Sequence, residues 1–205
     1  MNEEKINYDK KLKEIINNLN VKPKLLLHSC CGPCSSYVIT YLKDYFDITI
    51  LYYNPNIEPI EEYEKRKKEQ IRLINELNLD NVRFMDADYN NLLYHEKVIN
   101  HEYDKEGGLR CHICYELRLV YTKEIGIKNN FDYFGTTLTV SPYKNAKVIN
   151  ELGANLESDK IKWLYSDFKK NDGYKKSIIL SKEHNLYRQD YCGCLYSKNT
   201  DNLDC

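Results

Sequence analysis

The sequence lacks any long apolar run. No stretch of its 205 residues approaches the roughly 18 to 20 apolar residues of a membrane-spanning helix, so we expect no membrane partner. The first residues lead into a charged segment with no apolar core, which argues against a secretory signal peptide. The expected location is therefore the reducing cytoplasm, where free thiolates persist.

A surplus of charge of one sign is also missing. The chain holds 30 basic and 31 acidic residues, for a formal net charge of −1, so its composition carries no global signature of nucleic-acid binding. Internal repeats and low-complexity segments are absent as well. At this length we expect one well-buried domain.

Cysteine, in contrast, is abundant and strongly patterned. Seven of the eight cysteines form three tight groups, roughly 80 residues apart, and the eighth, Cys205, is predicted to be a tail thiol. Thiolates packed so closely repel one another and resist burial unless a soft cation neutralises them. The pattern thus predicts one polythiolate site for iron-sulfur, zinc or another thiophilic metal. The three groups are Cys30-Cys31-x-x-Cys34, Cys111-x-x-Cys114 and Cys192-x-Cys194.

Two other uses of cysteine compete with this interpretation. A disulfide scaffold is disfavoured because the expected compartment is reducing. A structural zinc site is a stronger rival, since CxxC pairs are common zinc ligands. Four ligands complete such a site, however, and seven clustered cysteines leave three over.

Apolar patterns along the chain alternate between strand-like and helix-like segments. This alternation predicts an α/β fold with a doubly wound parallel sheet. The expected strands cover residues 24–28, 48–53, 82–85 and 131–138, and the expected helices cover residues 7–19, 37–45, 61–77, 92–100 and 109–125.

Ligands of such folds collect at the carboxyl ends of the strands. We expect the first cysteine group to meet two further loops at this rim. The segment from Trp163 to Cys194 lacks the alternating pattern and is predicted to close over the rim, carrying its cysteine pair inward. The residues of the two further loops are Tyr53, Asn54, Asn56, Thr136 and Thr137.

The spacing within each cysteine group also predicts side-chain directions. Cys111 and Cys114 lie three apart on an expected helix, so both project from one face. Adjacent residues on extended backbone alternate, so Cys30 and Cys31 are expected to point in different directions. Gly193 is the small residue that lets its two neighbouring thiols share a partner.

Several residues near the cysteines invite more than one interpretation. Arg118 could stabilise cluster thiolates or meet a phosphate. Lys169 and Lys170, in a segment that mixes bases with aromatics, could bind a phosphate backbone or form a solvated loop. His28 is expected to be a buried, hydrogen-bonded strand residue, and none of the histidines is assigned to metal.

Six ordered motifs resemble the cobalamin-independent epoxyqueuosine reductases of the QueH type. The resemblance covers a predicted domain over residues 23–197, which leaves a helical extension over residues 1–22 and a tail over residues 198–205. The motifs are Leu26-Leu27-His28-Ser29-Cys30-Cys31-Gly32-Pro33-Cys34, Tyr53-Asn54-Pro55-Asn56-Ile57, Glu62-Tyr63-x-x-Arg66, Arg110-Cys111-x-x-Cys114-Tyr115-x-Leu117-Arg118-Leu119, Thr136-Thr137-Leu138-x-x-Ser141-Pro142-Tyr143 and Leu186-Tyr187-Arg188-Gln189-x-Tyr191-Cys192-Gly193-Cys194.

The resemblance implies a HUP-like (Rossmann-like) fold and a redox function. It implies a [4Fe-4S] cluster with an additional mononuclear iron, for which zinc can substitute, held by all seven grouped cysteines. The implied reaction reduces the epoxide of epoxyqueuosine, in the wobble nucleoside of a tRNA anticodon, to the alkene of queuosine. Such a reaction needs two electrons, for which we expect a donor of the ferredoxin or flavodoxin type.

Site roles follow as expectations from this implied chemistry. Tyr143, Asp190 or a water is expected to protonate the leaving oxygen. Arg118, Arg188, Lys169 and Lys170 are the expected contacts to the tRNA backbone, and Tyr53 or Tyr143 is expected to stack on a splayed anticodon base. The rim residues Asn54, Asn56, Thr136 and Thr137 complete the expected substrate contacts.

Two other functions suit parts of the sequence. An ATP-dependent tRNA thiolation enzyme would share the fold, but its phosphate loop needs glycines and serines where this chain has thiols and Pro33. A zinc-structured RNA-binding module would suit the basic aromatic segment. The identity of the bound metal distinguishes the module from the reductase.

Overall fold

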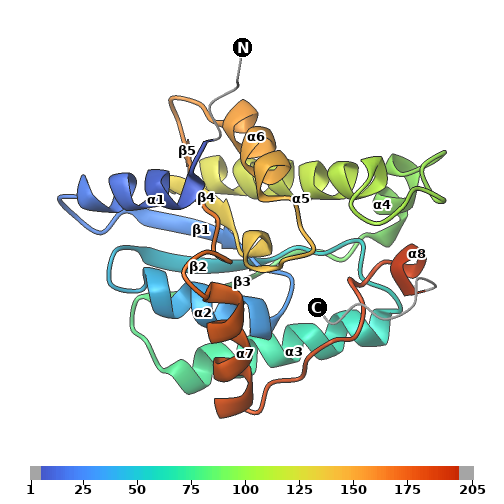
Figure 1. Cartoon of the computed structure of the whole chain (residues 1–205), viewed down its shortest axis with the longest axis horizontal. Coiled ribbons are helices and arrows are strands. Elements are labelled where there is room, and N and C mark those ends of the chain that lie inside the picture. The colour runs from blue at the N-terminus through green and yellow to red at the C-terminus, as the bar shows by residue number, and fades with distance from the viewer. Residues whose placement is uncertain (1–5, 199–205) are drawn as a thin grey trace.

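The computed structural model describes residues 6–198 and is built around one parallel sheet (Figure 1). The strand order is β3-β2-β1-β4-β5, and every pairing is parallel. The expected doubly wound α/β fold is confirmed. The strands are β1 Lys24–His28, β2 Asp47–Tyr52, β3 Val82–Asp86, β4 Tyr133–Thr136 and β5 Lys162–Trp163.

Helices cover both faces of the sheet. In Figure 1, α2, α3 and α7 lie on one side, and α5 and α6 lie on the other. None of the helices among residues 6–198 is long and apolar enough to cross a membrane. The helices are α1 Tyr8–Asn17, α2 Gly32–Leu42, α3 Ile60–Leu77, α4 Asn91–Lys97, α5 Leu109–Lys128, α6 Ala146–Leu156, α7 Gly173–Glu183 and α8 Leu195–Lys198, with a short 3₁₀ helix, η1, at Leu138–Val140.

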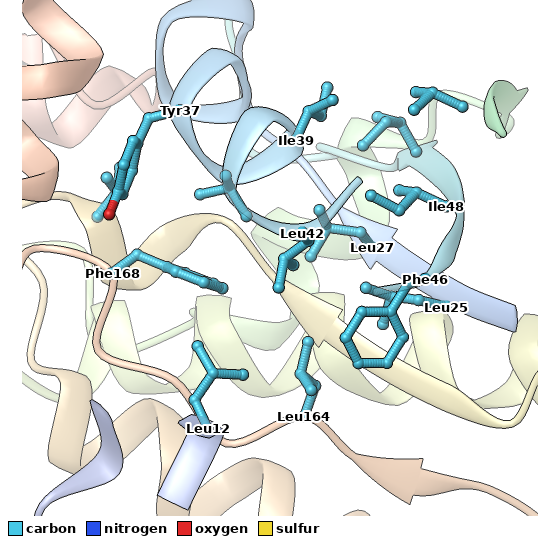
Figure 2. Packing of buried hydrophobic residues seen from close by; sticks show 14 of the residues in the cluster. Leu12, Leu25, Leu27, Tyr37, Ile39, Leu42, Phe46, Ile48, Leu164 and Phe168 are labelled. Carbon is cyan, nitrogen blue, oxygen red and sulfur yellow. The ribbon is translucent and has the colours of Figure 1, made fainter. Parts of the chain in front are cut away.

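The central strand β1 is buried on both faces. Leu25 and Leu27 pack in one cluster with Leu42 of α2, as Figure 2 shows, whereas Leu26 packs in a second cluster with Leu119 of α5. All three leucines of β1 are fully buried. This two-sided burial explains why the strand is a continuous apolar run in the sequence rather than an alternating one.

Several element boundaries differ from expectation, and two of the differences have a clear local cause. Helix α2 begins at Gly32, not at residue 37, because Pro33 occupies its first turn, where a missing N–H costs nothing. Strand β4 ends at Thr136, since the chain turns at once into η1. The helices α6 and α7 were not predicted from the sequence.

The N-terminal helix α1 packs against the rest of the molecule. Leu12 is 2 % exposed and belongs to the same buried cluster as Leu25. Tyr8 stacks on Tyr165 with the ring centroids 6.3 Å apart. The division of the chain at residue 22 stays a prediction, and the predicted tail over residues 198–205, with Cys205, lies outside the described residues apart from Lys198.

Candidate metal centre

The first cysteine group lies where the strand order reverses. The chain leaves β1 at His28 and enters α2 at Gly32, and β1 is flanked by β2 on one side and β4 on the other. Connections from β1 and β4 run to opposite faces at such a point, which leaves a crevice at the carboxyl ends of the strands. The fold thus places Cys30 and Cys31 in the position where ligands of open α/β sheets bind.

The three thiols of this group are gathered tightly. The Sγ atoms of Cys30, Cys31 and Cys34 all lie within 4.8 Å of one another, and those of Cys30 and Cys31 are 3.7 Å apart. Sulfur ligands about 2.3 Å from a tetrahedral ion lie about 3.8 Å apart. The donor atoms and their spacing therefore fit one thiophilic metal ion.

The expectation that Cys30 and Cys31 point in different directions is wrong. Side chains alternate only within a regular strand. Strand β1 ends at His28, and Cys31 is already the N-cap of α2, with φ −169° and ψ 155°. The bend between strand and helix turns both thiols toward Cys34.

Electrostatics within the group favour a bound cation. Hydrogen bonds from Cys31 and Cys34 hold the pKa of the Cys30 thiol well below its usual range. The same hydrogen bonding to Cys30 raises the pKa of Cys31 to about 12 and raises that of Cys34 well above its usual value. The three thiols therefore do not ionise with equal ease, and a bound metal ion would favour the ionised form of all three.

His28 joins the loops around this group. Its Nδ1 lies 2.9 Å from Thr136 Oγ1, and its Nε2 lies 3.1 Å from the carbonyl oxygen of Tyr53, to which it donates. Burial, with the nearby charge of Arg118, lowers the pKa of His28 to about 3, so the ring is neutral. The buried, hydrogen-bonded histidine expected from the sequence is confirmed.

The predicted rim residues also meet at this end of the sheet. Asn54 Nδ2 donates to the carbonyl oxygen of Ser29 at 2.9 Å, and the Thr137 amide donates to the carbonyl oxygen of His28 at 2.9 Å. Within residues 6–198, three buried oxygens here have no hydrogen-bond partner: Asn54 Oδ1, Asn56 Oδ1 and Thr137 Oγ1. Such groups are costly to bury unpaired, so they are suited to receive a polar ligand.

The second cysteine group lies in the first turns of α5. Cys111 and Cys114 are both buried, and Cys111 Sγ accepts a hydrogen bond from the Gly107 amide at 3.2 Å. Burial raises the pKa of Cys114 to about 12. Arg118 is 1 % exposed and donates from Nε to the Cys114 carbonyl at 3.0 Å. Of the two roles considered for Arg118, this burial favours stabilising thiolates over meeting a phosphate.

The third group is close to the other two. Cys192 lines a small cavity together with Cys30 and Cys34, and Lys144 Nζ lies 3.4 Å from Cys192 Sγ. Cys194 shares a buried cluster with Cys114. These contacts bring the three segments into one region, while the closure of the C-terminal segment over a bound metal stays a prediction.

The second and third groups are less tightly gathered than the first. Among residues 6–198, the Cys30-Cys31-Cys34 group alone offers three or more ligand atoms that all lie within 4.8 Å of one another. The set formed by the other two groups is therefore more open. Which metal each set holds stays a prediction.

A basic groove adjoins the small cavity. It has a volume of about 1110 Å³, begins at the start of α1, and runs past the loop before α6 to the turn before α7. Lys144 lines both the groove and the small cavity. The charged residues that line the groove are Lys144, Lys147, Lys169, Lys170, Glu151 and Asp167, so basic residues outnumber acidic ones.

The remaining predicted site residues differ in their access to solvent. Arg188 lines the small cavity. Tyr143 is 41 % exposed and Asp190 is exposed, and neither lines the small cavity. Tyr53 is buried and already stacks on Tyr121, with the centroids 3.7 Å apart. Of the two tyrosines proposed for base stacking, Tyr143 therefore has the accessible ring.

Sequence reasoning missed three polar residues close to the cysteines. Lys144 lies one residue beyond the Ser141-Pro142-Tyr143 motif, and Arg66 belongs to a quoted motif to which no role was given. Gln189 lines the small cavity and has a buried Oε1 without a partner among residues 6–198. In the sequence, the only signal of Arg66 and Gln189 is that they lie within quoted motifs, and the only signal of Lys144 is that it directly follows one.

Comparison with known proteins agrees with the motifs. The family model described as "Epoxyqueuosine reductase QueH" matches residues 25–200. The chain is 41 % identical to an epoxyqueuosine reductase QueH of Staphylococcus epidermidis, over all of this chain and 90 % of that protein. It is 38 % identical to that of Streptococcus pyogenes, over 98 % of this chain and 82 % of the relative. A Thermotoga maritima relative with the same name is 34 % identical over 84 % of this chain and 89 % of its own length.

These matches extend over nearly the whole chain and include all three cysteine groups. The resemblance noted in the sequence is confirmed, and with it the assignment as an enzyme of the oxidoreductase class. The chain belongs to the epoxyqueuosine reductase QueH family.

Proposed function

We propose that this protein reduces the epoxide of epoxyqueuosine, in the wobble nucleoside of a tRNA anticodon, to the alkene of queuosine. The family supplies the name of the reaction. The observation that carries the proposal for this chain is the three-thiol loop of Cys30, Cys31 and Cys34 at the switch point of the sheet. Thiolates in this position provide a site for a redox-active metal beside the ligand crevice.

We assign the cysteines to two metal sites. Cys30, Cys31 and Cys34 would hold the mononuclear iron, because their sulfurs have the spacing of ligands to one ion. The more open set would hold the [4Fe-4S] cluster, because four irons separate their ligand sulfurs more than one ion does. Arg118 and Lys144 lie beside this set and offset its negative charge. The more open set is Cys111, Cys114, Cys192 and Cys194.

Removing the epoxide oxygen requires two electrons and two protons and yields an alkene and water; the bound iron-sulfur centre supplies the electrons. The protein's own residues bind the nucleoside and deliver protons. Asn54, Asn56 and Thr137 offer their unpaired oxygens to polar groups of the substrate. The Tyr143 hydroxyl, the Asp190 carboxyl or a water is the proposed proton donor.

The basic groove is the proposed path of the RNA backbone. Lys169 and Lys170 line the groove, and Lys144 connects it to the cavity that Arg188 and the cysteines line. Phosphates bound along the lysines would lead the anticodon loop toward the sulfurs, and the accessible ring of Tyr143 would stack on a splayed base. The C-terminal segment would then close over the site, and a donor of the ferredoxin or flavodoxin type would supply electrons.

Anaerobic purification followed by a turnover assay tests the proposal. We expect a brown protein with iron and acid-labile sulfide that converts epoxyqueuosine to queuosine in tRNA when given a strong reductant. Digestion of the tRNA and mass spectrometry of its nucleosides measure the product. A colourless zinc protein without turnover would instead support an RNA-binding module, and adenylation of tRNA by ATP would support a thiolation enzyme.

A further inference from the structure

Helix α3 carries no cysteine, yet two of its buried polar side chains lie against cysteine segments. Arg66 is 1 % exposed and Gln70 is fully buried, and they are one helical turn apart. A buried charge is costly unless it is paired and hydrogen-bonded. The partners of these two side chains therefore indicate what α3 does for the site.

Arg66 binds the backbone of the C-terminal cysteine segment. Its Nη1 donates to the Cys192 carbonyl at 3.3 Å, and its Nη2 donates to the Tyr191 carbonyl at 3.2 Å. Glu62, one turn earlier, accepts from Arg66 Nε at 2.6 Å and from the Tyr187 hydroxyl at 3.0 Å. The pair of side chains thus binds both ends of the segment from residue 187 to residue 192.

Arg66 approaches the backbone closely at Gly193, where only glycine fits well. The φ of Gly193 is +119°, a conformation that side chains rarely adopt, and a Cβ there would lie 3.2 Å from Arg66 Nη1 and 2.9 Å from Ile57 Cγ1. The Gly193 carbonyl accepts from the Glu58 amide at 2.8 Å, just before α3. The turn between Cys192 and Cys194 therefore packs against the residues that precede α3 and against Arg66.

Gln70 binds the first cysteine loop in the same manner. Its Oε1 accepts from the Ser29 hydroxyl and from the Ser35 hydroxyl, each at 2.8 Å. Ser29 directly precedes Cys30, and Ser35 directly follows Cys34. One amide oxygen thus connects the two ends of the loop that carries all three thiols.

We propose that Arg66 and Gln70 are positioning residues that set the separation of two cysteine segments before any metal binds. Arg66 holds the Cys192-Cys194 turn, Gln70 holds the Cys30–Cys34 loop, and the rigid helix fixes the distance between them. The inference rests on the proposed function only in taking these cysteines as metal ligands. It gives the Glu62-Tyr63-x-x-Arg66 motif a role in the site.

Thiol alkylation of the full chain, treated with a chelator and a reductant, tests the proposal without metal. Arg66→Met should raise the alkylation rate of Cys192 and Cys194 by about tenfold, the factor expected when a charged hydrogen bond is lost, without raising the rates of Cys30, Cys31 and Cys34. Gln70→Met should raise the alkylation rates of Cys30, Cys31 and Cys34 and leave those of Cys192 and Cys194 unchanged. Arg66→Lys keeps a hydrogen-bond donor and Gln70→Glu keeps an acceptor. Both variants should therefore alkylate more slowly than the matching Met variants.

Arg72→Met is the matched control. Arg72 also lies on α3 and donates to backbone carbonyls of the C-terminal segment, those of His184 and Asn185, but it is exposed and contacts no cysteine segment. Its replacement should leave all seven rates unchanged. Mass spectrometry with isotopically distinct alkylating reagents reads each cysteine separately.

Iron content provides a second measurement. Each Met variant, reconstituted anaerobically, should bind iron at least about tenfold more weakly, as is typical when an outer-shell partner of a metal ligand is lost. Equal increases at all seven cysteines, or no change at Cys192 in Arg66→Met, would overturn the proposal. If the unaltered protein binds no iron and lacks turnover, the proposed function fails, while the cysteine-specific rates still decide the role of α3.

Discussion

Two cysteine segments reach the same cavity by different means. The Cys30–Cys34 loop is formed by local backbone, because β1 ends and α2 begins within five residues. The Cys192–Cys194 turn has no regular structure before α8 and is held by side chains far away in the sequence, including Arg66, 126 residues away. The first segment takes most of its geometry from the two elements it joins, with Gln70 connecting its ends, whereas the second takes its geometry from distant side chains.

The largest expected effect comes from removing the distant segment's thiols. Cys192→Ser combined with Cys194→Ser should abolish the visible iron-sulfur absorption and lower turnover by more than about 100-fold, because metal ligands matter more than outer-shell partners. Absorption spectra and product formation measure both losses. Cys205→Ser, outside the described residues, is the control. A brown and fully active double variant would contradict the assignment of these cysteines.

Breaking the local loop should separate the two metals. Cys31→Ser should remove the mononuclear iron and lower turnover by about 100-fold, while the cluster absorption persists, because the ligands of the open set are intact. Iron and sulfide analysis, read beside the absorption spectrum, measures the loss. Disappearance of the cluster in this variant would show that the two sets of cysteines do not hold separate metals.

Replacing one glycine in each cysteine segment compares how strongly the free energy of unfolding depends on the local backbone. Gly193→Ala should destabilise the protein by about 1–3 kcal/mol, since it strains a backbone at φ +119° and crowds Ile57. Gly32→Ala, in α2, meets only ordinary contacts at 3.6 Å and should change stability by less than about 1 kcal/mol. Urea unfolding of both variants in the same metal state measures the difference, and equal costs would refute it.

The smallest expected effect concerns the groove that leads to both segments. Lys169→Ala with Lys170→Ala should weaken RNA binding only several-fold, and each lost phosphate contact should reduce the salt slope by about 0.7. Binding of an anticodon stem-loop at several salt concentrations measures the slope. Lys128→Ala, at the end of α5 and away from the groove lining, is the control. An unchanged slope would exclude the groove as the path of the RNA.

Local patterns made part of this molecule predictable. The apolar run of β1 and the helical spacing of α3 appear in the structure almost where the sequence predicts them, because both patterns depend on neighbours within a few residues. The position of the first cysteine loop followed from the end of β1. The directions of Cys30 and Cys31 did not, because they depend on a bend between two elements.

The remainder depends on contacts between distant residues. Arg66, Gln70 and Lys144 acquire their relation to the cysteines only when α3 and the loop before α6 pack beside segments far along the chain. The sequence alone does not distinguish a buried arginine from an exposed one. For this reason Arg118, predicted with two open roles, could be placed in the interior only by the structure.

His28 connects the carboxyl ends of three strands by hydrogen bonds. A single neutral ring ties the last residue of β1 to the residue after β2 and to the last residue of β4. If the end of one of these strands moves, it must either break a hydrogen bond of the His28 ring or move the other strand ends with it. We therefore expect this wall of the crevice to stay rigid when a nucleoside enters, so that the accommodating movement falls to the C-terminal segment.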